Sequence, residues 1–92
     1  MRPFQPLLPT QLPDLLIDRA RAYAMEEDWR HAEEDLSRAI DIRADDALAL
    51  RLRAAARMHQ RSFDLAEADA QRALTLAANE EERVGAALVL GH

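Results

Sequence analysis

The chain repeats itself with a period of 34 residues, and this period limits its possible folds more than any other feature of the sequence. When the sequence is laid on itself with that shift and without a gap, Trp29 falls on Phe63, so apolar character survives where identity does not. The identical pairs include Leu16 and Leu50, Arg19 and Arg53, Ala20 and Ala54, Ala22 and Ala56, Ala32 and Ala66, Glu33 and Glu67, Asp35 and Asp69, Arg38 and Arg72, and Ala39 and Ala73. A unit of this length cannot bury its apolar face alone and has to stack on a neighbour.

Inside each period the apolar residues have helical spacing. Leu16, Ala20 and Tyr23 lie at i, i+4 and i+7, which places them on one stripe of a helix. Asp28 and Ser62 stand directly before an aromatic residue, at the position of a helix N-cap. The pattern predicts helices near residues 13–27, 29–43, 46–60, 63–77 and 80–91.

The residues that recur resemble the pattern of the tetratricopeptide repeat family. The matching positions are a small residue at the eighth place (Ala20, Ala54), an aromatic at the seventeenth (Trp29, Phe63), and alanine at the twentieth (Ala32, Ala66) and the twenty-seventh (Ala39, Ala73). Two antiparallel helices approach to about 8–10 Å where the facing side chains are small, which explains the recurring alanines. The resemblance implies an all-α fold, a right-handed superhelical solenoid of two helix-turn-helix repeats plus a fifth C-terminal helix.

The domain organisation follows from the same register. We expect a Pro-rich extended lead-in over residues 1–12, one repeat over 13–46, a second over 47–80, and a capping helix or the first helix of a truncated third repeat over 81–92. Prolines at a spacing of three suit polyproline II in the lead-in. We interpret this segment as an extension lying on its own first helix, with a Pro-rich ligand for another domain as the alternative.

Charge and composition exclude several classes of partner. Seventeen acidic residues against twelve basic ones give a net charge of −5, which disfavours nucleic acid. No apolar run approaches the length of a membrane span, and a cytoplasmic location is the default expectation. All basic residues are arginine and alanine and leucine are abundant, a bias that fits G- and C-rich codons and suggests a bacterial source.

No arrangement of side chains predicts an enzyme. The chain has no cysteine and no Gly-rich phosphate loop, and most of its acidic residues stand at predicted turns and helix starts, where the helix dipole favours negative charge. The three histidines, His31, His59 and His92, form no HExxH metal-binding motif, and we interpret them as surface or groove residues. We therefore predict no catalytic residue, no metal site and no cofactor.

One charged pair recurs as a unit, since Arg19 and Asp35 are repeated as Arg53 and Asp69. The arginines could bind a ligand. We favour the alternative, a brace in which the arginine of a first helix pairs with the aspartate of the second, because both partners recur together and arginine suits bidentate pairing.

In the tetratricopeptide family the first helix of each hairpin lines a concave groove that holds a peptide or helix of a partner protein. Carried over by position, the partner-binding groove consists of Ile17, Arg21, Ala24, Met25, Leu48, Arg51, Leu52, Ala55, Met58 and His59. The second of these helices is basic, since residues 47–62 contain four arginines and no acidic residue. An acidic protein or peptide is therefore the expected partner.

Two functions remain open at this point. The first is a protein–protein interaction module, an adaptor or scaffold that binds a partner in the groove. The second is a structural or self-associating segment of a longer repeat protein with no ligand of its own. For the second, the C-terminal run offers Val84, Leu88 and Val89 as the apolar face of a possible homodimer.

Overall fold

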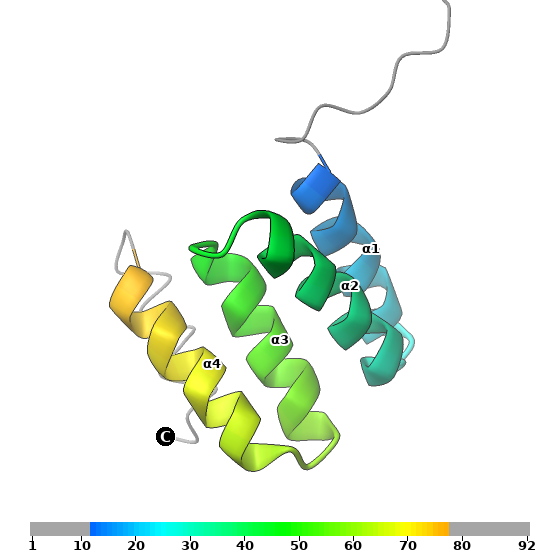
Figure 1. Ribbon diagram of the computed structural model, residues 1–92. Coiled ribbons are helices and arrows are strands. Elements are labelled where there is room, and N and C mark those ends of the chain that lie inside the picture. The colour runs from blue at the N-terminus through cyan, green and yellow to red at the C-terminus, as the bar shows by residue number, and fades with distance from the viewer. Residues whose placement is uncertain (1–11, 78–92) are drawn as a thin grey trace, which may run out of the picture.

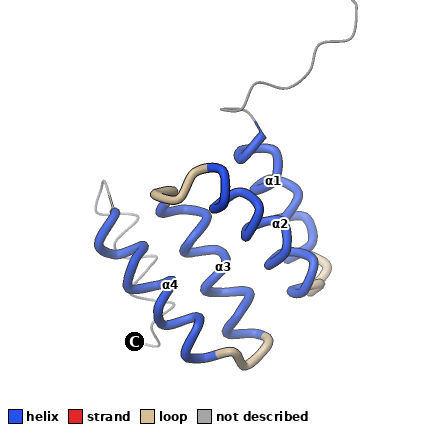
Figure 2. The backbone as a smooth tube through the Cα atoms, in the orientation of Figure 1, coloured by secondary structure: helices blue, strands red, loops and turns tan. Residues whose placement is uncertain are grey.

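The computed structural model describes residues 12–77, which form four α-helices (Figure 1). The helices are α1 (Leu12–Met25), α2 (Trp29–Ile42), α3 (Ala47–His59) and α4 (Phe63–Leu76). Their ends differ from the predicted ones by two residues at most, and within this range there is no strand (Figure 2). The predicted fifth helix, residues 78–80 of the second repeat and all of the lead-in except Leu12 lie outside the described residues. None of the four helices is long and apolar enough to cross a membrane.

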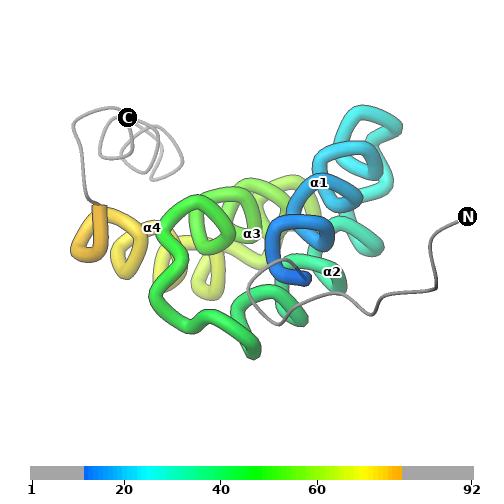
Figure 3. The backbone as a smooth tube through the Cα atoms, turned by 90° about the horizontal axis from the view of Figure 1, so that it is seen from above, coloured from blue at the N-terminus to red at the C-terminus, as the bar shows by residue number. Residues whose placement is uncertain are grey.

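The helices pack in chain order, α1 on α2, α2 on α3 and α3 on α4. Seen from above, α1 and α3 lie along one side of the molecule and α2 and α4 along the other (Figure 3). Alanine occupies the positions of closest approach, and the six alanines of the family pattern are 0–2% exposed. Larger side chains fill the space between the hairpins, with Leu36 and Leu50 fully buried. The all-helical fold with helices packed as neighbouring pairs is confirmed for the described part of the chain.

The two turns inside the hairpins have the same geometry. Glu27 and Arg61, one period apart, have φ values of 59° and 66°, in the left-handed region. The N–H of Asp28 donates to the carbonyl of Tyr23 at 2.9 Å, and that of Ser62 donates to Arg57 at 2.8 Å, which closes the helix end in each case. Glycine is the residue best suited to this position, and a residue with a Cβ atom is strained there.

One of the two helix caps predicted above, Asp28, makes its capping hydrogen bond, and a further cap stands at the start of α3. The Asp28 carboxylate accepts a hydrogen bond from the N–H of His31 at 3.3 Å, and the Asp46 carboxylate accepts one from the N–H of Ala49 at 3.1 Å. Asp46 is thus the cap of α3. Ser62 occupies the N-cap position of α4 without a side-chain hydrogen bond.

The predicted brace is confirmed in both hairpins. The guanidinium of Arg19 donates to the two carboxylate oxygens of Asp35 at 2.6 and 2.7 Å, and Arg53 donates to those of Asp69 at 2.7 and 2.8 Å. The carboxylate side chains are only 5% and 7% exposed. Bidentate pairing of this kind fixes the rotation of one helix against the next as well as their distance.

In the second hairpin the brace extends into a network that also holds the first hairpin. Arg57 donates to Asp69 and to Glu33 at 2.7 Å each, and Gln60 donates to Glu33 at 2.8 Å. Arg53 reaches the hydroxyl of Ser37 on α2 at 3.3 Å. Desolvation raises the pKa of Glu33, but the hydrogen bonds from Arg57 and Gln60 outweigh it and hold that pKa below its ordinary value. The network therefore ties α2, α3 and α4 together.

Asp69→Asn should destabilise the protein by about 3–5 kcal/mol, because it leaves two nearly buried guanidinium groups without their shared carboxylate. Urea unfolding followed by circular dichroism measures the effect. The matched variant Asp35→Asn should cost less, because the Arg19 side chain is 56% exposed and water can solvate it. Equal losses in both variants would contradict the role given to the network.

Glu27→Gly and Arg61→Gly should each stabilise the protein by about 0.5–1 kcal/mol, because glycine relieves the left-handed strain at a smaller entropic cost. The same urea titration tests this. Arg38→Gly, an exposed position inside α2, is the control and should destabilise by about 1 kcal/mol. A loss of stability in both turn variants would contradict the backbone strain assigned to Glu27 and Arg61.

Candidate functional site

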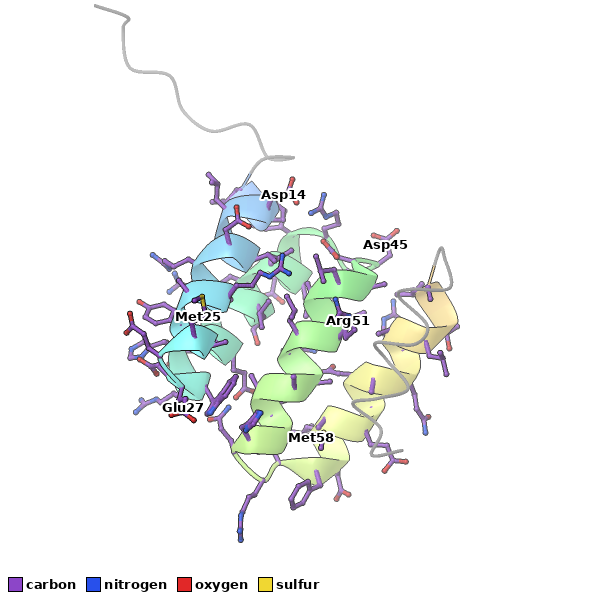
Figure 4. The ribbon with its side chains drawn as sticks, turned by 180° about the vertical axis from the view of Figure 1, so that it is seen from behind. Asp14, Met25, Glu27, Asp45, Arg51 and Met58 are labelled. Carbon is purple, nitrogen blue, oxygen red and sulfur yellow. The ribbon has the colours of Figure 1, made fainter. Side chains whose placement is uncertain are left out.

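Two hollows open between α1 and α3, on the face of the molecule seen in Figure 4. The wide hollow has a volume of about 540 Å³ and is lined by Asp14, Ile17, Asp18, Arg21, Arg43, Asp45, Asp46, Ala47, Leu48 and Leu76. The narrow slot has a volume of about 50 Å³ and is lined by Ala20, Arg21, Ala24, Trp29, Ala32, Leu36, Leu52, Ala55 and Ala56. Arg21 borders both, so the two hollows are neighbours, and we call them together the groove.

The wide hollow has an apolar floor and a negative wall. Four aspartates and two arginines line it. Arg43 is held between two of these aspartates, donating to Asp14 at 2.6 Å and to Asp46 at 3.0 Å. The hydrogen bond to Asp14 raises the pKa of Arg43 above its ordinary value. Four aspartates against two arginines give the lining a formal charge of −2, so the hollow favours a cation.

The aspartates gather here because two helices begin at this end. Asp14 lies in the first turn of α1, and Asp46 caps α3. Negative charge is stabilised at both places by the helix dipole, which is the local reason for the residue types. In Figure 4, Asp14 and Asp45 stand at the same end of the molecule, on either side of the space between α1 and α3.

The narrow slot is apolar and is formed by small side chains. Five of its nine lining residues are alanines, and Trp29 closes one end. The imidazole of His59 stacks on the Trp29 indole with ring centroids 3.9 Å apart and an angle of 3° between the planes. The end of α3 is thereby attached to the start of α2.

Six of the residues predicted for the groove line one of the two hollows: Ile17, Arg21, Ala24, Leu48, Leu52 and Ala55. Ile17 is only 4% exposed and belongs to the floor. The other four do not line them. Met25 is 87% exposed, His59 lies on Trp29, and the side chains of Arg51 and Met58 lie on the side of α3 away from α1 (Figure 4).

Two of the arginines of α3 form hydrogen bonds and ion pairs inside the fold. Arg53 and Arg57 have side chains 15% exposed and bind Asp69, Glu33 and Ser37. The expectation of an acidic partner rested on four arginines, and these two do not reach the groove. Among the arginines of residues 12–77, Arg21 on α1 is the one that borders both hollows.

The sequence interpretation missed the acidic wall of the groove. It gave Asp14 and Asp18 no role, and Asp45 and Asp46 fell among the acidic residues at predicted turns and helix starts. A signal was present, because Asp14, Ile17, Asp18 and Arg21 lie at i, i+3, i+4 and i+7 and so share one face of α1. The predicted self-association residues Val84, Leu88 and Val89 lie outside the described residues.

Comparison of the chain with protein-family models and with curated proteins found no match. The likeness to tetratricopeptide repeats therefore rests on the residues quoted above. The function has to be inferred from the groove and from the surfaces of the four described helices.

His59→Ala should shift the emission of Trp29, the single tryptophan, to longer wavelength, because the indole loses the ring that covers it. The variant should also lose about 0.5–1.5 kcal/mol of stability, the usual contribution of an aromatic pair. His31→Ala is the control, because His31 stacks on Tyr23 with centroids 5.0 Å apart. Unchanged emission in His59→Ala would contradict the stacked arrangement.

Proposed function

We propose that this protein is a protein–protein interaction module of the tetratricopeptide type, which holds a peptide or helix of a partner in the groove between α1 and α3. The right-handed superhelix and the fifth C-terminal helix are part of this proposal. It is supported by features that recur with the 34-residue period in the described helices: the bidentate brace, the left-handed turn residue and the buried alanines. The proposal assigns no catalytic residue, metal or cofactor.

The observation that carries the proposal is the pair of neighbouring hollows between α1 and α3. Its wide hollow, at about 540 Å³, is within the usual range of about 300–1,000 Å³ for ligand sites. The slot beside it has the apolar lining that accepts a small aliphatic side chain. A groove with an apolar slot and a charged hollow suits a peptide, which can present both kinds of side chain in a fixed order.

The groove also suggests the chemistry of the ligand. The net negative wall of the wide hollow favours a Lys or Arg side chain, whereas an acidic ligand would depend mainly on Arg21. The residues that line the two hollows are centred about four positions apart on α1 and about seven on α3, or roughly 6–10 Å at 1.5 Å per residue. An extended peptide covers that distance with about two or three residues. We therefore propose a ligand in which a small apolar and a basic residue are about two or three positions apart.

Selection of a random-peptide display library on the full chain tests both parts of the proposal. Enrichment of peptides with a small apolar and a basic residue at this spacing is the expected result. Enrichment of acidic peptides that compete for the same groove would keep the function and reverse the partner's charge. A library without any enriched peptide would count against the groove as a binding site.

The double variant Asp18→Lys and Asp45→Lys should weaken binding of a selected basic peptide about tenfold or more, because both exposed carboxylates line the wide hollow. Fluorescence anisotropy of the labelled peptide measures this. Glu34→Lys with Asp64→Lys is the matched control, since these exposed acidic residues lie on α2 and α4, outside both hollows. Equal weakening in both variants would indicate a general charge effect.

A further inference from the structure

Three pairs of side chains join α2 to α3 in addition to the apolar core, and Gln60, the C-cap of α3, also donates to Glu33 at 2.8 Å. Trp29 stacks on His59. Glu33 accepts a hydrogen bond from Arg57, and the Ser37 hydroxyl accepts one from Arg53. Each pair joins one residue of a second helix to one residue of the first helix of the next hairpin. The contact is therefore the junction between the two repeating units.

One period later the same face exists on α4. The counterparts of the α2 residues are Phe63, Glu67 and Gln71, together with Leu74 in place of Ile40, and we call these four residues the tail face. All four are exposed, Phe63 at 59% and Leu74 at 37%. In α2, by contrast, the residues at these places are half-buried under α3.

One period earlier the matching face exists on α1. The counterparts of the α3 residues are Arg19, Tyr23 and Met25, with Leu15 in place of Ala49, and we call these four residues the head face. Leu15 is 46% and Met25 is 87% exposed, whereas Ala49 is fully buried at the junction. Figures 1 and 3 show α1 and α4 at opposite ends of the row of helices.

At three places the head and tail faces are chemically complementary in the register of the internal junction, whereas at a fourth Glu26, the counterpart of Gln60, would face Glu67 with like charge. Met25 would lie on the ring of Phe63, a favourable sulfur–aromatic contact. The hydroxyl of Tyr23 would donate to the carboxylate of Glu67. Arg19 donates hydrogen bonds to Asp35 from Nε and Nη2, so these two atoms are occupied. Its Nη1 corresponds to the Nη1 of Arg53, which donates a hydrogen bond to Ser37. The residue at that place on the tail face is Gln71, whose amide oxygen is an acceptor.

We propose that two copies of this chain associate head to tail, with α1 of one copy docked on α4 of the next in the way that α3 docks on α2. The competing occupant of the tail face is the chain's own segment 81–92. One period after Arg53 and Arg57 that segment has Ala87 and Gly91, which offer no side-chain donor to Gln71 or Glu67. The head face supplies a donor at both places.

A contact between two different faces does not close on itself, so it produces a growing row of copies rather than a two-fold dimer. Such a row continues the alternation of first and second helices from one copy to the next. The grooves between first helices would then align, and one long ligand could contact several copies. This inference does not depend on the proposed peptide binding.

The test combines two variants of the full chain, each at an exposed position. Met25→Glu removes the head face and Phe63→Glu removes the tail face, so each variant alone should be monomeric by sedimentation equilibrium. An equimolar mixture should form dimers and stop there, because it contains one intact head face and one intact tail face per pair. The wild-type mass should instead rise steadily with concentration.

Ile42→Glu is the matched control, a substitution at an apolar residue 45% exposed and outside both faces, and it should associate like the wild type. A wild-type chain that stays monomeric at millimolar concentration, or that stops at a dimer, would overturn the inference. So would a mixture of the two variants that remains monomeric. Peptide binding by the chain carrying both substitutions, which leave the groove intact, tests the proposed function separately.

Discussion

The arrangement of the second hairpin depends on the buried carboxylate of Asp69. This one group accepts three hydrogen bonds, two from Arg53 and one from Arg57, while its side chain is 7% exposed. Burying a lone carboxylate is costly, and the cost is offset only when geometry and hydrogen bonding are complete. The position of α4 is therefore coupled to the side-chain orientation of two residues on α3, and these in turn reach α2.

Pairing inside the fold also determines the charge of the groove. The arginines of α3 give that helix a basic sequence, but the guanidinium groups that matter most for stability point toward α2 and α4. At the other end, aspartates that stabilise the starts of α1 and α3 converge on one hollow. A helix can thus be basic in sequence and border a groove that is acidic on balance.

The two hairpins share a period but differ in how far their braces extend. Tyr23 stacks on His31 in the first hairpin, whereas Arg57, one period later, links Asp69 to Glu33 of the preceding unit. Arg57 therefore differs in residue type from Tyr23, its counterpart one period earlier, and has a clear structural use. The difference follows from the neighbours: α3 has a helix pair before it in the described chain, and α1 does not.

The sequence by itself determined the helices, their order, the brace and the recurring alanines, because these depend on local periodicity and on residues that repeat at one fixed distance. Four helix spans were predicted to within two residues on this basis. The sequence also indicated six of the residues that line the groove, since position on a helix face follows from spacing. The tertiary structure alone decided which arginines are paired inside the fold, that His59 stacks on Trp29, and that Asp14, Asp18, Asp45 and Asp46 line one hollow. These features join residues from different helices, and their meeting depends on how the helices rotate and pack, which no local pattern specifies.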